Sequence, residues 1–366
     1  MGSDNFPRPG EETISERLQK CGVTGAGGAG FPTYVKWQNL EKIKSLLVNL
    51  QEGEPVFYGD KWLVKNNIDL YRRGLNYFLN NCFERIIIGS KEKYRKKWFE
   101  ELEKELEARI ILPDDLPVGD NSGDDILLAY TAERYELSQE TALLWTTAGV
   151  RIGQDLPTEH GWIVQNAETF YNICRAVFYN KPVLKKQVAI YGPEIKHSFF
   201  EVPAGTRVID LLAEMGVNYP PPASRPVLLD GGPGWCSKID CEPARAVVSK
   251  RTNGIMLADQ KFVEKYRDCD PPERINALKG KKWTSDKHQT SPQPFTPEIV
   301  AIPLISNPYL SGLVKKSVPV VKKGEKLKAG DIVAEPAQKG ISNFQHASIS
   351  GRVNSVTADQ IFIEKN

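Results

Sequence analysis

The sequence predicts an α/β domain with a parallel sheet, then a small α+β module, then an all-β C-terminal domain. Three observations predict this order. In the first half, short apolar runs alternate with segments of helical spacing, which is typical of a parallel sheet. From Lys186 strand and turn signals surround one helical segment, and from Glu298 strand signals dominate. The 366 residues leave room for three domains, because single cores stop growing at about 250–300 residues.

The first domain begins with the helical spacing of Ile14 and Leu18, which leads into a glycine-rich loop. Pro32 suits an early helical turn, so residues 33–44 are predicted as a helix and 45–50, SLLVNL, as a buried strand. Further helices are predicted over 68–82, over the charged amphipathic stretch 91–108 and in the second half of 125–150. A strand is predicted at 85–89, and residues 154–179 are predicted as a loop followed by a helix. The domain is expected to end near Pro182.

The second half is predicted to hold two small domains. Strand signals at 187–193, 199–207 and 225–235 surround the helix VIDLLAEMG, which indicates a module of the β-grasp kind. Pro, Lys, Ser, Thr and Gln dominate residues 268–297, which are predicted as a linker. Turns at KKGEKLKAGD and SISGRV punctuate the final β stretch. The predicted domains are 1–182, 183–260, a linker at 261–297, and 298–366.

Composition excludes several classes of function. With 48 basic and 46 acidic residues, no global field attracts nucleic acid or an anionic membrane. No apolar run reaches the roughly 20 residues that span a bilayer, and the polar N-terminus does not resemble a signal sequence, so a cytosolic location is expected. The six cysteines form no CxxC pair, and free thiols are therefore favoured over a metal site. Cys236 and Cys241 are the only close pair.

The glycine-rich loop within Gly22–Trp37 has the composition of a backbone segment that wraps a phosphate. Glycines accept positive φ and let main-chain N–H groups approach an anion, and Lys36 adds a point charge. Residues 25–30 match G-x-G-x-x-G, with Glu52 at the distance of a Rossmann ribose-binding acid. A helical segment, not a strand, precedes this match. A non-Rossmann nucleotide or flavin loop is therefore preferred, and a plain glycine-rich turn is the alternative.

A second polar cluster, residues 49–55, directly follows the predicted strand 45–50. Open parallel sheets place their ligands at the carboxyl ends of strands. Two carboxylates and two amides at such a position can orient hydroxyls and ring nitrogens. An ordinary polar loop is the alternative, and the neighbouring glycine loop favours a site.

Four segments in the same order resemble one family. GAGGAGFPTYVKW is similar to the flavin-binding loop of the NADH-oxidising flavoprotein subunit of respiratory complex I and of the Rnf-complex C subunit. NLQEGEP, YELSQETAL and VQNAETFYNI resemble its three following motifs. Residues 187–259 resemble its soluble-ligand-binding β-grasp domain, and the tail resembles a barrel-sandwich domain related to lipoyl and biotinyl carriers. The cobalamin reductases of propanediol-utilisation microcompartments have the same domain order, with a tail of this kind at the C-terminus.

The resemblance implies an FMN site. Its loop glycines would contact the phosphate and ribityl chain, with Lys36 at the phosphate or ring edge. The ring would lie against Asn49, Gln51 and Glu52, with Tyr135 and Glu140 on the opposite wall. The implied cofactor-binding residues are Gly25, Gly27, Gly28, Gly30, Lys36, Asn49, Gln51, Glu52, Tyr135, Glu140, Asn166 and Thr169. NADH would contact Phe31, Glu52 and Glu54, with Glu52 as the catalytic residue, and no metal site is expected.

Departures from the family pattern shape the expected function. Gln51, Ala26 and Ser138 replace an aspartate, an arginine and a glycine of complex I, so FMN is better supported than NADH. The stretch that carries ferredoxin-like clusters in relatives holds only Cys269, which cannot bind a cubane cluster, so no iron–sulfur cluster is expected. The tail turn 347–351 lacks the lysine of a swinging arm, which favours a structural or docking role. His346 beside it is expected at the surface or as a cap.

The resemblance therefore implies an FMN-dependent electron-transfer flavoprotein. It would oxidise NADH or a reduced carrier and pass electrons to a corrinoid protein or cofactor, a flavodoxin or an iron–sulfur protein. The alternative is a non-catalytic scaffold or ligand-binding subunit of a redox complex. No nucleic acid and no membrane span are expected, and a homo-oligomer is compatible with the sequence. The expected location is the cytoplasm, with a microcompartment lumen or the periphery of a membrane complex left open.

Overall fold

The computed structural model describes residues 12–119, 126–219, 226–268, 274–279 and 288–366. The polar N-terminal sequence up to residue 11 and Cys269 lie outside these ranges. The chain divides into two units with interleaved segments. The first unit comprises Met1–Gln19, Thr33–Gly53 and Asp60–Asn180, and the second comprises Lys20–Pro32, Glu54–Gly59 and Lys181–Asn366.

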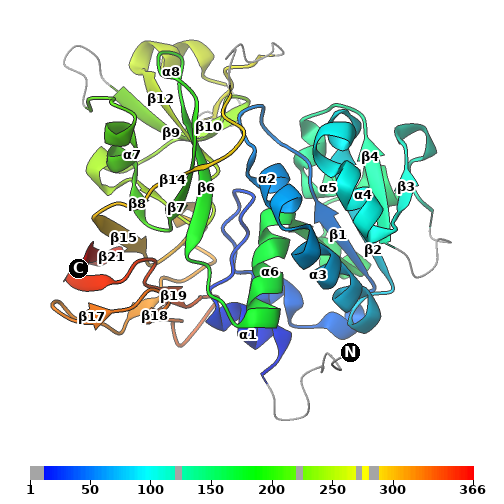
Figure 1. Ribbon diagram of the computed structural model, residues 1–366, viewed down its shortest axis with the longest axis horizontal. Coiled ribbons are helices and arrows are strands. Elements are labelled where there is room, and N and C mark those ends of the chain that lie inside the picture. Colours follow the sequence, from blue (N-terminus) through cyan, green and yellow to red (C-terminus); the bar gives the residue numbers. More distant parts are fainter. Residues whose placement is uncertain (1–11, 120–125, 220–225, 269–273, 280–287) are drawn as a thin grey trace. The chain divides into compact units, whose positions relative to one another are not determined.

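The first unit contains a five-stranded, fully parallel sheet of order β3-β4-β2-β1-β5 (Figure 1). Its strands are β1 (Ser45–Asn49), β2 (Arg85–Lys91), β3 (Arg109–Ile111), β4 (Ile126–Thr131) and β5 (Trp162–Asn166). The α-helices are α1 (Ile14–Lys20), α2 (Gly59–Asn66), α3 (Ile68–Asn81), α4 (Glu100–Leu106), α5 (Glu140–Ala148) and α6 (Ala167–Tyr179). This confirms the predicted α/β fold with a parallel sheet.

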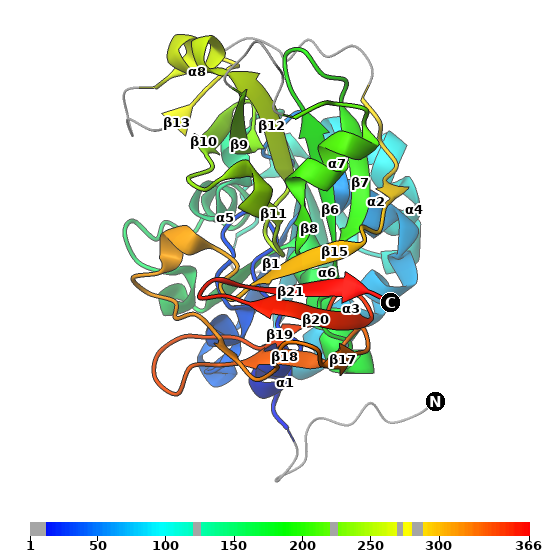
Figure 2. The same cartoon turned by 90° about the vertical axis from the view of Figure 1, so that its left-hand side faces the viewer.

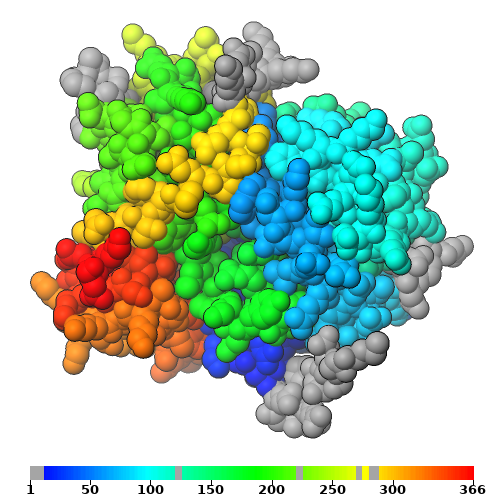
Figure 3. Space-filling model, viewed as in Figure 1, coloured from blue at the N-terminus to red at the C-terminus, as the bar shows by residue number. Residues whose placement is uncertain are grey.

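Side-chain alternation in the strands builds the core of the first unit. Leu47, Ile87 and Leu127 point to the face that Leu143 and Leu144 of α5 cover. Strands buried on both faces read as continuous apolar runs, as SLLVN and RIIIGSK do. Helix α3 packs against β2 and α6, and in the space-filling view these two helices share one surface (Figure 3).

Three predictions for the first unit need correction. Residues 33–44 form two short 3-10 helices, η1 (Thr33–Trp37) and η2 (Leu40–Lys42), instead of an α-helix. The predicted helix over 91–108 begins only after the strand end at Lys91, passing through η3 (Glu92–Tyr94) and a π-turn, η4 (Arg95–Phe99), before α4. Strand β5 occupies part of the predicted loop, because its apolar run WIV is too short to show a period. Further short helices are η5 (Pro113–Asp115), η6 (Glu136–Ser138) and η7 (Pro157–His160).

The second unit is rich in β-structure (Figure 2). A seven-stranded mixed sheet has the order β13-β10-β9-β12-β6-β7-β14. Its elements are β6 (Lys185–Tyr191), β7 (Ser198–Pro203), β9 (Pro226–Gly232), β10 (Trp235–Lys238), β12 (Gly254–Asp259), β13 (Arg274–Ile275), β14 (Gln293–Pro294), α7 (Val208–Glu214), η8 (Pro243–Arg245) and α8 (Gln260–Tyr266). The expected linker 261–297 thus contributes most of α8 and the two edge strands of this sheet.

The predicted strand-rich tail is confirmed. A six-stranded sheet has the order β11-β8-β15-β21-β20-β17, and a three-stranded sheet has the order β16-β18-β19. Their strands are β8 (Thr206–Arg207), β11 (Val247–Val248), β15 (Ile299–Pro303), β16 (Val318–Pro319), β17 (Lys326–Leu327), β18 (Ile332–Glu335), β19 (Gln345–His346), β20 (Gly351–Val356) and β21 (Gln360–Lys365), with η9 at Pro308–Leu310. Val300, Val333, Val353 and Ile361 belong to one buried core.

Candidate functional site

Polar side chains gather at the carboxyl edge of the parallel sheet in the first unit. The register places Asn49 of β1 beside Asn166 of β5 and Gly89 of β2. Lys91 and Thr131 are the last residues of β2 and β4. Because all five strands run the same way, these ends lie at one edge, where open α/β sheets bind ligands.

Asn49 and Gln51 are fixed by their own hydrogen bonds at this edge. Asn49 Nδ2 donates to the Ser138 carbonyl oxygen at 2.8 Å, and Asn49 Oδ1 accepts from the Gln51 backbone N–H at 3.0 Å. Gln51 Nε2 donates to Thr131 Oγ1 at 2.9 Å. The buried Gln51 Oε1 has no hydrogen-bond partner among the described residues. Gln51 therefore keeps one acceptor that the described part of the chain leaves without a donor.

Glu52 lies in a buried cluster of charges. Its carboxylate is 2.8 Å from Lys61 Nζ, and both side chains are nearly inaccessible. Burial raises the pKa of Glu52 and lowers that of Lys61, and the attraction between them opposes both shifts. Lys91 Nζ donates to the Glu52 carbonyl oxygen at 2.6 Å, and burial lowers the pKa of Lys91 to about 8. Lys61 therefore contacts the Glu52 carboxylate, and Lys91 contacts its backbone carbonyl group.

Aromatic rings cover these lysines. Lys61 Nζ lies 4.0 Å from the centre of the Tyr94 ring, and Lys91 Nζ lies 4.0 Å from the centre of the predicted site residue Tyr135. Cation–π contacts of this kind favour the charged form of each lysine. The structure thus brings Tyr135 to the same cluster as Glu52 through Lys91.

Four other predicted residues of the first unit form two pairs. Lys36 Nζ donates to Glu140 Oε2 at 3.0 Å, and both side chains are about one third exposed. Asn166 is the N-cap of α6 and accepts from the Thr169 backbone N–H at 3.2 Å. Asn166 Nδ2 donates to Asp60 Oδ2 at 2.7 Å. Asn166 and Thr169 therefore shape the start of α6.

The glycine loop belongs to the second unit. It is closed by hydrogen bonds from Gly25 N–H to the Phe31 carbonyl at 2.8 Å and from Gly30 N–H to the Gly25 carbonyl at 2.9 Å. At its tip Gly27 and Ala29 are exposed. Gly28 has φ +109°, and a Cβ built on it would meet no atom within 4 Å. The tip is therefore open on the side where an added group would project.

The loop glycines differ in their surroundings. A Cβ on Gly30, with φ +65°, would lie 2.7 Å from Arg251 Cδ and 2.8 Å from Asn307 Cβ. A Cβ on Gly25 would meet only ordinary contacts at 3.7 Å. Gly30 is thus required by packing, whereas Gly28 combines a left-handed backbone with open space. An open tip with accessible backbone N–H groups fits a phosphate-bearing ligand.

Two residues proposed for NADH contact also belong to the second unit. Phe31 is half-buried. The buried carboxylate of Glu54 accepts a hydrogen bond from the Gly234 backbone N–H at 2.7 Å, and a Cβ on Gly232 would lie 2.0 Å from Glu54 Cγ. Glu54 therefore holds the turn between β9 and β10.

Several residues of these clusters were not predicted from the sequence. Lys61, Asp60 and Lys91 adjoin the predicted site residues Glu52 and Asn166. Lys91 has a signal that sequence reasoning can use, because it ends the apolar strand RIIIGSK next to the strand that ends at Asn49. Lys61 and Asp60 have no such signal, since they come from a helix that the sequence pattern did not reveal.

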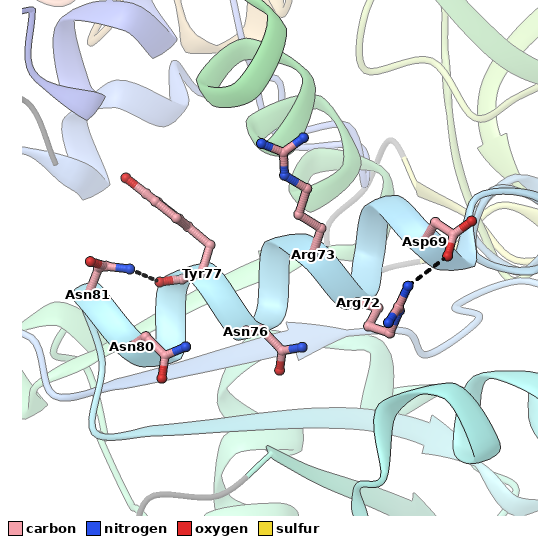
Figure 4. A pocket seen from close by; sticks show the side chains of 7 residues that line it. All are labelled: Asp69, Arg72, Arg73, Asn76, Tyr77, Asn80 and Asn81. Carbon is pink, nitrogen blue, oxygen red and sulfur yellow. Dashed lines mark hydrogen bonds and ion pairs between the residues drawn. The ribbon is translucent and has the colours of Figure 1, made fainter. Parts of the chain in front are cut away.

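A hollow lies along α3 in the first unit (Figure 4). It is lined by Asp69, Arg72, Arg73, Asn76, Tyr77, Asn80 and Asn81. Figure 4 shows Arg73 and Tyr77 pointing to one side of the helix and Asn76 to the other. Side chains that diverge in this way do not converge on a ligand, and none of them is a predicted site residue.

Thiols and histidines supply no metal centre in the part of the chain that is described. The described cysteines form no disulfide, namely Cys21, Cys82, Cys174, Cys236 and Cys241. His197 stacks on His288 with ring centres 4.6 Å apart, a proximity that their sequence spacing does not indicate. His346 is buried, not at the surface as expected, and burial beside Lys250 lowers its pKa to about 3. None of the described helices is long and apolar enough to cross a membrane.

Comparison with known proteins gives a family for the first part of the chain. Residues 18–175 match the family model described as the Nuo51 FMN-binding domain. Cobalamin reductase PduS of Citrobacter freundii is 32% identical over 254 residues, which cover 67% of this chain and 50% of that protein. PduS of Salmonella typhimurium is 31% identical over 251 residues, again covering 67% and 50%.

More distant relatives agree with this match. The C subunit of the ion-translocating oxidoreductase complex of Pasteurella multocida is 26% identical over 262 residues, covering 70% of this chain and 29% of that protein. The chain thus spans half or less of the length of these curated relatives. A chain in the crystal structure of an NAD+-reducing NiFe-hydrogenase in the H2-reduced state has a TM-score of 0.51 and 19% identity, covering 69% of this chain and 49% of that chain. This likeness shows a shared fold.

The glycine loop, the polar edge of the parallel sheet and the family match all fall within one segment of the sequence. Residues 18–175 match the FMN-binding domain of the Nuo51 family, in a chain similar to cobalamin reductases and to the C subunits of ion-translocating oxidoreductase complexes.

Proposed function

We propose that the protein is an FMN-dependent electron-transfer flavoprotein. It would oxidise NADH, or a reduced carrier, and pass electrons to a protein partner or a corrinoid cofactor. The observation that carries the proposal is the open tip of the glycine loop, at Gly28, within the segment that matches an FMN-binding domain. The names of the relatives, a cobalamin reductase and a subunit of an ion-translocating oxidoreductase, support the electron-transfer role.

The proposed binding residues form two groups, one at the glycine loop and one at the edge of the parallel sheet. Gly25, Gly27, Gly28 and Gly30 would contact the phosphate and ribityl chain, with the N–H groups of Gly27 and Gly28 as donors and Lys36 adding positive charge. At the sheet edge Asn49, Gln51, Glu52, Tyr135, Glu140, Asn166 and Thr169 would surround the flavin. Gln51 Oε1 supports this assignment, because it is a buried acceptor that lacks a partner among the described residues. Bound FMN would supply the hydride and single-electron chemistry of the flavin ring.

NADH is the proposed electron donor, with Phe31, Glu52 and Glu54 as its proposed contacts. Phe31 is accessible enough to stack on a flat ring. Glu52 and Glu54 are buried and already bound, to Lys61 and to the Gly234 N–H. A buried Glu52 would influence the site through its charge and that of Lys61. This makes NADH dependence the part of the proposal that needs its own test.

The β-rich half would carry the two further domains expected from the sequence. A β-grasp module at 183–260 is supported by α7, whose Val208, Leu211 and Leu212 share a core with β6, β7 and β12. A barrel-sandwich domain at 298–366 is supported by the buried core that joins β15, β18, β20 and β21. With no CxxC pair in the sequence, we propose that no iron–sulfur cluster is held and that the electron acceptor docks as a separate redox protein. We also propose a cytoplasmic location.

Anaerobic reduction tests the proposal. The chain is incubated with FMN, freed of unbound flavin, and titrated with NADH while the visible spectrum is followed. We expect bound flavin that NADH bleaches. Bound flavin that dithionite bleaches and NADH does not would contradict NADH as donor and leave a reduced carrier. A chain that retains no FMN would contradict the proposal and favour the alternative of a non-catalytic scaffold.

A further inference from the structure

The carbonyl groups of the glycine loop are held by side chains that lie far away in the sequence. Lys186 Nζ and Asn253 Nδ2 donate to the Ala26 carbonyl oxygen at 3.1 and 3.0 Å. Arg251 Nη1 donates to the Gly28 carbonyl at 3.1 Å, and Asn307 Nδ2 donates to the Ala29 carbonyl at 2.8 Å. We call Lys186, Arg251, Asn253 and Asn307 the carbonyl clamp. All four lie outside the segment 18–175 that matches the FMN-binding domain.

The clamp determines where the loop N–H groups point. In a planar trans peptide the C=O and N–H groups point in opposite directions. Because the Ala26 and Gly28 carbonyls face the clamp, the N–H groups of Gly27 and Ala29 face away from it. No acceptor among the described residues binds the N–H of Gly27, Gly28 or Ala29. Gly27 and Ala29 are also exposed, so the loop tip offers free N–H groups that can donate to an anion.

The clamp side chains are themselves fixed. Lys186 is fully buried, and its Nζ also donates to Asn253 Oδ1 at 2.8 Å. Arg251 forms an ion pair with Asp230, and its side chain is 13% exposed. Asn307 Oδ1 accepts from the Tyr309 backbone N–H at 3.1 Å. Side chains held in this way lose little further entropy when they hold the loop.

Charge adds to this geometry. Lys186 and Arg251 place two cations on the carbonyl side of the loop, where they polarise the peptide groups and strengthen the N–H groups as donors. Charge-assisted hydrogen bonds are about twice as strong as neutral ones. The loop therefore has charged donors on its carbonyl side and free N–H donors on the other side, an arrangement that favours a phosphate over a neutral group.

We propose that Lys186, Arg251, Asn253 and Asn307 are positioning residues that hold Gly25–Gly30 in the conformation that binds a phosphate monoester. The inference rests on the proposed function in that FMN is the ligand that carries this phosphate. The β-rich part of the chain thereby sets the selectivity of the FMN-binding domain for FMN over riboflavin, which has the same ring system and no phosphate.

The test measures binding of FMN and riboflavin to the full chain by quenching of flavin fluorescence. Asn253→Ala and Asn307→Ala each remove one donor to the loop tip. Asn343→Ala is the matched control, because Asn343 Nδ2 donates at 3.0 Å to the Val23 carbonyl, outside the loop tip. Since one hydrogen bond contributes about 1 kcal/mol, we expect each tip variant to bind FMN about fivefold more weakly, with riboflavin affinity unchanged. The control should keep the wild-type ratio of the two affinities.

The outcomes separate the inference from the function on which it rests. Equal affinity of the wild type for FMN and riboflavin, or tip variants with the wild-type ratio, would overturn the clamp while FMN binding stands. A wild type that binds neither flavin would overturn both. Inorganic phosphate gives a measurement that does not depend on the folding of any variant. It should compete with FMN and leave riboflavin binding unaffected, and a failure to compete would also overturn the inference.

Discussion

Gly28 is the residue on which the proposed FMN loop depends most directly. It has a left-handed backbone, with φ +109°, and open space around its Cβ position. Packing therefore does not explain the glycine, in contrast to Gly30, whose Cβ would clash with Arg251 and Asn307. The open space is where a bound phosphate would come close to the main chain.

Gly28→Val is expected to abolish tight FMN binding with a modest loss of stability. A β-branched residue at positive φ costs about 1–3 kcal/mol of strain, and its side chain would fill the open space. Gly324→Val is the control, because Gly324 has φ +89° in a turn of the second unit and also meets no atom within 4 Å. Both variants should melt at similar temperatures in a thermal scan. Unchanged FMN affinity in Gly28→Val would show that the loop assignment is wrong.

Glu52 and Lys61 are expected to depend on each other for stability. Glu52→Gln leaves the buried Lys61 without its counter-charge, and breaking a buried pair on one side costs about 3–5 kcal/mol. Replacing both partners, Glu52→Gln with Lys61→Met, should recover much of that loss. Urea unfolding of the two single variants and the double variant measures the coupling. Additive effects would contradict the ion pair.

The same carboxylate affects the proposed chemistry. Glu52→Gln should retain FMN while slowing its reduction by NADH, because the local charge beside the flavin changes. Stopped-flow absorbance under anaerobic conditions measures the reduction rate. A normal rate in a chain that still binds FMN would show that Glu52 does not act in the nicotinamide site.

At the scale of elements, the base of the glycine loop is anchored by a buried lysine. Lys250 Nζ donates to the Gly22 carbonyl at 2.9 Å, with Cys21 and His346 as the titratable groups beside it. Burial lowers the pKa of Lys250 to about 7. Between pH 7 and the ordinary lysine pKa near 10.5, the unfolded chain therefore keeps a proton on Lys250 that the folded chain has released.

The sign of this shift gives a pH prediction. Folding stability should rise as the pH rises from 7, because the unfolded chain binds more protons in this range. Lys250→Met removes the titrating group and should flatten the dependence of melting temperature on pH between 7 and 9. Lys328→Met, at an exposed lysine, should keep the wild-type slope. A Lys250→Met chain with an unchanged slope would contradict the shift.

The secondary-structure elements differ in how well the sequence predicts them. Strands β1 and β2 were predictable, because uninterrupted apolar runs buried on both faces give a strong signal. The prediction of a helix over 33–44 was wrong. The β-branched and aromatic residues of TYVKW disfavour an α-helix, and this segment forms a 3-10 helix instead. Strand β5 was missed because three apolar residues show no period.

The candidate site was predictable to a similar degree. Gly28 and Asn49 could be found, because a glycine cluster and a strand end have local signals. Lys61 and the carbonyl clamp could not be found, because their roles arise from contacts between segments far apart in the sequence. Arg251 donates to Gly28 across 223 positions of the chain, and no local pattern encodes such a pairing.

At the scale of the whole molecule, the loop of an FMN-binding domain is held by a β-rich part of the same chain. The proposed absence of an iron–sulfur cluster belongs to this scale. Protein purified anaerobically should contain no stoichiometric iron or acid-labile sulfide by colorimetric assay. Two or more irons per chain with matching sulfide would contradict that proposal and would make a separate acceptor unnecessary for the first electron-transfer step.

The central claim is that this chain binds FMN, and equilibrium binding tests it most directly. FMN is titrated into the flavin-free chain, and after gel filtration the absorbance of the protein fraction is compared with its concentration. We expect one FMN per chain, carried with the protein through the column. A protein fraction that leaves the column without flavin, while the chain remains folded by circular dichroism, would contradict this claim.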